Sequence, residues 1–212
     1  MTKAEQLAKL WAQLETDLPK LPLGDINEPT VPGDGNPDSE IMFIGEAPGY
    51  YESVQRKPFV GRSGQLFTNT SAKVGFPRPD VYITNIVKVR PPENRDPFPA
   101  EILAYRPYLD QEIEIIKPLL IITLGRYSMA KFLPEVKISQ VHGRLHRVKW
   151  HDHWQYILPM YHPAAALRNP HNKVAFEEDF QKIPKIIPWI KERMVAQVDS
   201  EKMENKIKEA LF

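Results

Sequence analysis

The sequence predicts an α/β fold in which a parallel sheet lies between layers of helices. Three observations support this prediction. Four short apolar runs have the character of buried strands, stretches with helical spacing separate them, and the segments that follow the runs are polar and rich in Gly and Pro. Ligands of open α/β sheets bind outside the carboxyl ends of the strands. We therefore expect one functional site where these segments converge.

The N-terminal part of the chain is expected to form a helix and a loop. Apolar side chains recur at helical spacing over residues 4–18, which indicates an amphipathic helix. Proline and glycine punctuate residues 19–37, which indicates a loop. The apolar run EIMFI at residues 40–44 is the first predicted strand.

Helices and strands alternate through the middle of the chain. Residues 62–74 and 100–117 have helical patterns, and Pro107 is a possible break in the second of these helices. The apolar runs VYITN and LLIITL predict the second and third strands at residues 81–85 and 119–124.

The C-terminal part is expected to supply the last strand and further helices. A short helix is expected after Gly125, and a turn at residues 152–155 precedes the fourth predicted strand, YILPMY at residues 156–161. The final stretch, residues 173–212, has the composition of helices interrupted by two prolines.

The composition limits the class of protein. The length suits one domain spanning residues 1–212, with an N-terminal helix and loop at 1–37 and C-terminal helices at 171–212. The absence of cysteine excludes disulfides, cysteine nucleophiles and thiolate metal sites, and the histidine spacing indicates no other metal site. No apolar run approaches the roughly 18–20 residues of a membrane span, so we expect a cytoplasmic protein without a membrane partner. Since the net charge is only +1, an anionic partner must be held by a local positive patch.

Two carboxylates and an aromatic ring lie in the segment after the first predicted strand. Glu46 directly follows the strand in GEAPGYY, and Glu52 lies around the same turn, so that one or both can reach the crevice at the sheet edge. Phe59, in KPFVG, has the rigid surroundings of a ring that stacks on a planar base. Ordinary surface carboxylates and a core aromatic ring are the simpler explanations.

Asn85 and His162 lie at the ends of the second and fourth predicted strands. A carboxamide offers one acceptor oxygen and two donor hydrogens, so it can pair with an amide-like edge. A histidine can donate a hydrogen bond to a developing anion. An asparagine that caps the next segment and a purely structural histidine are the alternatives, and the two positions taken singly leave them open.

The segment after His162 indicates contact with a nucleic acid. Leu167, Arg168 and Asn169 combine an apolar wedge with groups that bind phosphate, as expected of a loop that enters DNA. Local positive charge at the other strand ends comes from Lys88, Arg90, Arg95 and Arg126.

Taken together, these segments resemble the uracil-DNA glycosylase superfamily, and most closely its family 4. The matching patterns are GEAPG…E…PFVG, TNxVKxRPPxNRxP and YHPAAxLRNP, in order from about Leu18 to Pro170. The resemblance implies a three-layer α/β/α sandwich around a four-stranded, mainly parallel sheet. It also implies a monofunctional glycosylase of base excision repair, which flips uracil out of single- or double-stranded DNA and hydrolyses the N-glycosidic bond to leave an abasic site. We expect a monomer, because one face is enough to contact DNA.

The resemblance assigns roles to the residues that bind the base. Phe59 would stack on uracil, Asn85 would recognise its Watson–Crick edge, and His162 would hydrogen-bond O2 and stabilise the leaving anion. Ala47 would belong to the uracil site, at a position where the better-known branch of the superfamily has a catalytic aspartate.

The resemblance also implies a role for a carboxylate. Glu46 and Glu52 match acidic positions of the first motif, and one of them should orient the attacking water and stabilise the positively charged sugar. We predict that Glu46 takes part in the chemistry and that Glu52 shapes the pocket. Because Ala47 supplies no carboxylate, catalysis would depend largely on stabilisation of the leaving group.

The chain departs from family 4 in its cysteines. Family 4 enzymes hold a four-iron cluster through four cysteines, whereas this chain has none. The corresponding positions fall at about Leu18, Leu21, Val89 and Tyr105, so we expect no iron–sulfur cluster and no other cofactor. A small apolar cluster there would hold the same loops together by burial of apolar surface.

Two further departures concern the contacts with DNA and base. Ala166 lies where the family pattern has leucine, so Leu167 would carry the wedge alone or the loop would be blunted. Tyr50 and Tyr51 are bulkier than the residues common in the family. One ring would crowd the C5 face of the base and exclude thymine, narrow the pocket, or cover the phosphate.

Two other functions with the same fold remain open. One is a glycosylase for another deaminated base, hypoxanthine or xanthine, and the other is a non-catalytic DNA-binding or polymerase-associated subunit. The joint presence of Glu46, Phe59, Asn85 and His162 favours the enzyme, because a scaffold would not need all four side chains.

Overall fold

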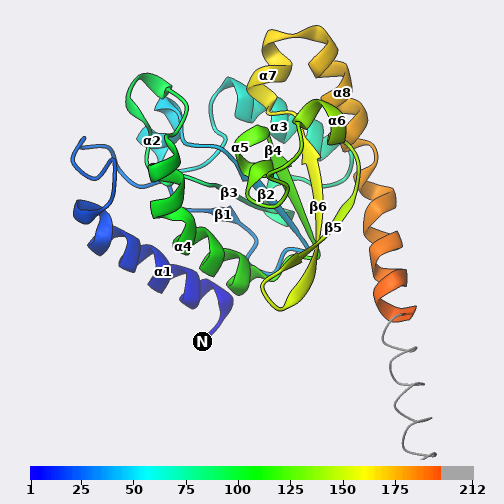
Figure 1. Cartoon of the computed structure of the whole chain (residues 1–212), viewed down its shortest axis with the longest axis horizontal. Helices are drawn as coiled ribbons and strands as arrows, with labels where there is room; N and C mark the ends of the chain where they lie inside the picture. The colour runs from blue at the N-terminus through cyan, green and yellow to red at the C-terminus, as the bar shows by residue number, and fades with distance from the viewer. Residues whose placement is uncertain (197–212) are drawn as a thin grey trace, which may run out of the picture.

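The computed structural model describes residues 1–196 and contains a mixed six-stranded sheet (Figure 1). The strands follow the order β1-β3-β2-β4-β6-β5. The four central strands are parallel to one another and correspond to the four predicted ones, which confirms the α/β class and the mainly parallel sheet. Their bounds are Ile41–Gly45 for β2, Tyr82–Asn85 for β3, Leu120–Leu124 for β4 and His153–Met160 for β6.

The predicted number of four strands was wrong, because an antiparallel strand lies at each edge of the sheet. β1 (Asp34–Gly35) pairs with β3, and β5 (His146–Trp150) pairs with β6 in a hairpin. The expected turn at residues 152–155 is correspondingly shorter, since β6 begins at His153. Both edge strands lack an apolar run: β1 has two residues, and β5 alternates between exposed and partly buried side chains before Trp150. Edge strands of this kind carry little hydrophobic signal.

One layer of helices covers one face of the sheet. α1 (Lys3–Asp17) and α4 (Pro99–Ile116) pack through apolar side chains against the face that presents Met42, Ile44 and Ile121. Alternate residues of a strand point to opposite faces, so the neighbouring side chains of the same strands form the second half of the core.

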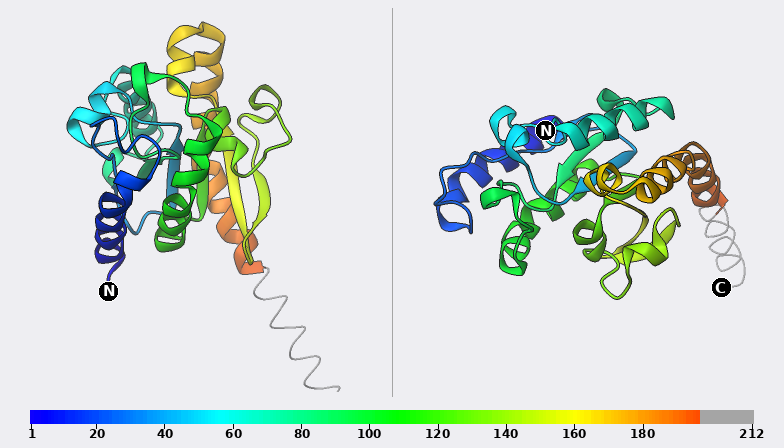
Figure 2. Two further views of the ribbon diagram at one scale, coloured as in Figure 1. Left: turned by 60° about the vertical axis from the view of Figure 1, so that its left-hand side comes forward. Right: turned by 90° about the horizontal axis from the view of Figure 1, so that it is seen from above.

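The second layer covers the opposite face, formed by Ile41, Phe43 and Ile122. It consists of α3 (Arg62–Lys73), α8 (Pro170–Phe180) and a helix over residues 183–196. Figure 2 shows α1, in blue, and the helix 183–196, in orange, on opposite sides of the molecule. The three-layer arrangement expected from the resemblance is therefore confirmed.

Proline interrupts the helices less than the sequence indicated. α4 continues through Pro107, whose ring leaves the carbonyl of Leu103 without its helical partner. Leu103 is exposed, so water can satisfy that carbonyl. The helix 183–196 likewise contains Pro184, in its first turn, and Pro188. The rest of the expected C-terminal helix, residues 197–212, lies outside the described residues.

Short elements complete the chain and lie mostly around the carboxyl ends of the strands. The short helix expected after Gly125 is α5 (Arg126–Ala130). The other short helices, which the sequence did not indicate, are α2 (Tyr50–Gln55), α6 (Ile138–Val141), α7 (Pro163–Arg168), and the 3-10 turns η1 (Leu18–Lys20), η2 (Arg78–Asp80) and η3 (Pro92–Asn94). Within residues 1–196, no helix combines the length and the apolar character needed to cross a membrane.

Candidate active site

The carboxyl ends of β2, β3 and β6 meet around one cavity of about 330 Å³. Gly45 and Asn85, the last residues of β2 and β3, are direct partners in the parallel register, and His162 lies just beyond the end of β6. A volume near this value is typical of small-molecule sites. Eight of the residues singled out in the sequence line the cavity: Glu46, Ala47, Glu52, Phe59, Asn85, Arg95, His162 and Arg168.

Gly45 allows the Asn85 amide and the Phe59 ring to approach each other closely. A Cβ atom at Gly45 would overlap both Asn85 Oδ1 and Phe59 Cζ. Asn85 is buried, and its Oδ1 atom accepts no hydrogen bond from any of the described residues. Because a buried unpaired oxygen is costly, this acceptor is positioned for a donor on a ligand.

The Phe59 ring forms one wall of the cavity and is held by the backbone. Its φ angle is 54°, a left-handed conformation that is uncommon for a bulky residue. Arg78 fixes this conformation, since its guanidinium donates to the carbonyl oxygens of Pro58, at 2.6 Å, and of Phe59, at 3.1 Å. The ring also packs against Phe67 in the core. Phe59 is therefore both a core aromatic residue and part of the cavity wall.

Glu52 supports the same loop from the other side. Its Oε1 atom accepts hydrogen bonds from the backbone N–H groups of Val60, at 2.9 Å, and Gly61, at 2.8 Å. The side chain is buried beneath the turn. These contacts fit the predicted role of Glu52 in shaping the pocket.

His162 lies in the cavity as a neutral hydrogen-bond donor. It is the N-cap of α7, and its Nδ1 atom accepts the backbone N–H of Ala164 at 3.2 Å. This hydrogen bond assigns the ring proton to Nε2. Burial, with a smaller effect of the nearby Arg168, lowers the pKa of His162 to about 4. The ring is 5.7 Å from that of Phe59 between centroids, so Nε2–H is available to an oxygen of a base stacked on Phe59.

Glu46 has an unusual electrostatic environment. Burial, followed by the negative charge of Asp96, raises the pKa of Glu46 to about 7, although Arg126 and Arg168 oppose the shift. A hydrogen bond to the Asp96 side chain adds to the upward shift of the Glu46 pKa. Asp96 also lines the cavity, and the sequence analysis missed it because it falls at a variable position of the NRxP pattern.

The residues predicted to contact DNA occupy different environments. Leu167 is exposed at the end of α7, and Arg168 reaches the cavity, as a wedge and its neighbour would. Asn169 caps α8, accepting the N–H of His171 at 2.9 Å. Ala166 is buried in the core, so Leu167 is the exposed apolar side chain of this pair. The contacts of these residues with DNA stay predictions.

The predicted positive charges are partly neutralised within the fold. Arg90 binds Glu28 at 3.0 Å, and Arg126 binds Asp96 at 2.6 Å. The expectation that Lys88 supplies surface charge was wrong: Lys88 is fully buried and pairs with Glu112 at 2.6 Å. Its partner is 24 residues away in the sequence, so the pairing leaves no local pattern.

Tyr50 and Tyr51 do not line the cavity. Both rings are more than half exposed at the start of α2, and the guanidinium of Arg90 lies over the Tyr50 ring at 5.2 Å. The suggestion that one ring narrows the base pocket or crowds C5 is therefore corrected, because both side chains are largely exposed and neither lines the cavity.

The positions that correspond to the family 4 cysteines lie in one apolar cluster. Val89 and Tyr105 are buried there, and Leu18 and Leu21 pack against the same core. The Tyr105 hydroxyl donates to the carbonyl oxygen of Pro22 at 2.8 Å. Aliphatic and phenolic side chains do not provide the thiolate ligands that an iron–sulfur cluster needs, so these residues do not fit that group.

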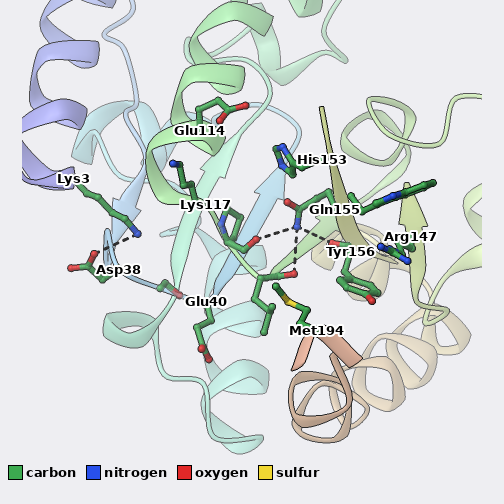
Figure 3. Close-up of a pocket in the computed structure, with 14 residues that line it drawn as sticks. Lys3, Asp38, Glu40, Glu114, Lys117, Arg147, His153, Gln155, Tyr156 and Met194 are labelled. Carbon is green, nitrogen blue, oxygen red and sulfur yellow. Dashed lines mark hydrogen bonds and ion pairs between the residues drawn. The ribbon is translucent and has the colours of Figure 1, made fainter. Parts of the chain in front are cut away.

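A second cavity, of about 720 Å³, lies at the opposite edge of the sheet (Figure 3). It is formed where the strands begin, and both acidic and basic side chains line it, among them the Lys3–Asp38 pair at 3.5 Å. Gln155 donates from Nε2 to the carbonyl oxygens of Pro118 and Tyr156, at 3.2 and 3.3 Å. None of the predicted site residues lines this cavity.

The fold and the cavity define a member of the uracil-DNA glycosylase superfamily. A model of the Uracil DNA glycosylase superfamily matches residues 32–185, which include every residue that lines the cavity around Asn85 and His162. The chain belongs to this superfamily.

Within it, the chain is similar to type-4 enzymes. The type-4 uracil-DNA glycosylase of Saccharolobus solfataricus is 46% identical over 170 residues, which cover 77% of this chain and 79% of that protein. The type-4 enzyme of Sulfurisphaera tokodaii is 46% identical over 159 residues, covering 72% of each chain. A DNA polymerase of Bacillus phage SP01 is 35% identical over 182 residues, covering 81% of this chain but 19% of the polymerase.

Proposed function

We propose that this protein is a uracil-DNA glycosylase that flips uracil out of DNA and hydrolyses its N-glycosidic bond in base excision repair. The observation that carries the proposal is the unpaired Oδ1 atom of Asn85, buried beside the Phe59 ring. A uracil stacked on Phe59 would offer its N3–H to this oxygen, whereas the unprotonated N3 of cytosine has no hydrogen to donate. The superfamily membership and the type-4 relatives support the same activity.

The geometry supports a division of labour in the reaction. As the bond between N1 and C1′ breaks, its electron pair passes to uracil, and Nε2–H of neutral His162 hydrogen-bonds the developing charge on O2. A neutral donor of this kind gains its strength from the low dielectric of the buried site. Water forms the new bond to C1′, and the carboxylate of Glu46 accepts its proton. Glu52 keeps the Phe59 loop in place.

The contact with DNA belongs to the same proposal. Leu167 fills the gap left by the flipped nucleotide, while Arg168 and the arginines near the strand ends approach phosphates. We place the reaction on single- or double-stranded DNA, in the cytoplasm, with the protein as a monomer. We further propose that it needs no iron–sulfur cluster, because an apolar cluster occupies the corresponding positions.

The test is excision from a labelled oligonucleotide that carries one uracil, presented single-stranded and opposite G or A. We expect alkali-labile breaks in the presence of a metal chelator, and their loss in His162→Ala. The control His153→Ala removes a histidine from the cavity at the opposite edge and should retain excision. Binding without cleavage would favour the non-catalytic subunit, and cleavage at hypoxanthine or xanthine alone would favour the other base specificity.

A further inference from the structure

We propose that Asp96 is a positioning residue that sets the proton occupancy of Glu46, and that Arg126 and Tyr127 hold Asp96 for this purpose. The inference rests on the proposed function, in which Glu46 accepts a proton from water. It assigns a role to Asp96 and Tyr127, which the proposed contacts with the base leave unexplained, and a second role to Arg126.

The first step is the contact between the two carboxyl groups. Glu46 follows β2 and Asp96 follows η3, and both line the same cavity. A hydrogen bond between the two side chains is one of the causes that raise the pKa of Glu46. A carboxylate has only acceptor oxygens, so this contact needs one proton between the two groups.

The second step identifies the group that carries this proton. Asp96 already accepts hydrogen bonds from Arg126 Nη2, at 2.6 Å, and from the Tyr127 hydroxyl, at 2.9 Å. Asp96 is also well exposed to solvent. Glu46 is the more buried of the two, and none of the residues 1–196 forms an ion pair with it. Because burial disfavours the charged form of a carboxyl group, the proton resides on Glu46.

The third step considers the other charges that face Glu46. Arg126, at the start of α5, and Arg168, at the end of α7, favour its ionised form, while His162 is neutral and contributes no charge. Burial and Asp96 act against the two arginines, with the result that the pKa of Glu46 lies near neutrality. Asp96 and Arg126 therefore affect the same proton in opposite directions, although they are bonded to each other.

The opposite signs make the inference testable through the pH dependence of the rate. The measurement is the single-turnover rate of uracil excision, with the enzyme in excess over DNA at a saturating concentration, from acid to mildly alkaline pH. In the wild type, we expect the rate to rise with pH through about 7, as Glu46 loses its proton. We call this rising part of the pH–rate profile the acid limb. Asp96→Asn should move this acid limb to lower pH by about one pH unit. Arg126→Gln should move it to higher pH.

The controls separate this effect from general damage. Asp38→Asn makes the same substitution in a carboxylate paired with a cation at the opposite edge, and it should leave the limb unchanged. Glu46→Gln should lower the excision rate greatly at every pH and abolish the rise of the rate with pH. Circular dichroism checks folding, and if Asp96→Asn does not fold, the direction of the shift in Arg126→Gln remains decisive.

The possible failures are distinguishable. A wild-type protein that does not excise uracil would overturn the proposed function itself. Excision with an acid limb that stays in place in both variants, or that moves in the same direction in both, would overturn the role of Asp96 and leave the glycosylase assignment intact.

Discussion

His162 and Glu46 share one cavity, yet burial changes their pKa values in opposite directions. Desolvation disfavours the charged form of either group. It therefore lowers the pKa of His162 to about 4 and raises that of Glu46 to about 7. At neutral pH, the histidine is a neutral donor and the glutamate exchanges its proton readily, which are the states that the proposed reaction requires.

These shifts predict opposite effects of pH on stability. The ordinary pKa values are 4.5 for Glu46 and 6.5 for His162. Folded Glu46 binds a proton more tightly than unfolded Glu46, so its contribution to the free energy of unfolding is lost as the pH rises from 4.5 to about 7. His162 binds a proton less tightly when folded, so its contribution is lost as the pH falls from 6.5 to about 4.

Removing either group should therefore relieve destabilisation at one end of the pH range. Relative to the wild type, Glu46→Gln should gain about 2 kcal/mol between about pH 5 and pH 8, and His162→Gln about 2 kcal/mol between about pH 7.5 and pH 4.5. Urea denaturation at each pH measures the differences. Equal offsets at all pH values would show that the two groups titrate alike in the folded and unfolded states.

At the scale of single residues, the sequence identified the functional groups that directly follow strands. It missed the groups whose role depends on a partner far away in the sequence. Asn85 and His162 were found because a polar side chain after an apolar run must lie at the edge of the sheet. Asp96 was missed because its importance comes from Glu46, 50 positions away in the chain and adjacent in the cavity. Lys88 was misplaced for the same reason, since Glu112 lies on a distant helix.

At the scale of elements, α7 combines two parts of the proposed mechanism within six residues. Its N-cap is His162, and its last turn exposes Leu167, while Ala166 packs into the core. The catalytic donor and the wedge are therefore fixed to one short rigid element, so that entry of Leu167 into DNA and delivery of the base to His162 are geometrically linked.

Leu167→Ala should consequently impair excision from duplex DNA more than from single strands. Unstacking a paired base costs a few kcal/mol, and the wedge offsets this cost only where a stack exists. We expect a loss of about tenfold or more on the duplex and little change on the single strand. Val174→Ala is the matched control, because Val174 is an exposed apolar residue on the adjacent α8. Equal losses on both substrates would argue against a wedge.

The elements that the sequence missed are the short ones. α2, α6 and α7 contain four to six residues each, which is too few for a helical period to be recognisable. The long helices were recovered from the helical spacing of their residues, and the four central strands from continuous apolar runs, which are buried on both faces of the sheet. Pro107 was over-interpreted, since an exposed carbonyl can tolerate the loss of its helical partner.

At the scale of the whole molecule, a buried polar network ties the sheet to one helical layer. The ammonium group of Lys88 donates to Glu112 at 2.6 Å and to Thr84 at 2.5 Å, and the Tyr82 hydroxyl donates to Glu112 at 2.9 Å. Lys88 and Glu112 are both fully buried. The network joins β3, whose end carries Asn85, to α4.

Breaking this network should destabilise the entire fold. Glu112→Gln leaves the ammonium group of Lys88 without a counter-charge, and the expected loss is about 3–5 kcal/mol in the free energy of unfolding. Glu114→Gln, two residues further along the same helix and exposed, should change it by less than about 0.5 kcal/mol. Urea denaturation measures both. The double variant Lys88→Met/Glu112→Leu should recover much of the loss, because neither charge then remains buried.

The absence of thiols, together with the exposed face of α8 beside α7, makes the protein suited to site-specific labelling. Since the sequence contains no cysteine, a single Val174→Cys substitution would create a unique attachment point for a maleimide fluorophore. Val174 is 55% exposed and lies outside the cavity, so the dye would leave Leu167 and the base site untouched. Its emission would follow the arrival of DNA at α7 in stopped-flow experiments, on the unmodified catalytic machinery and without the removal of any natural cysteine.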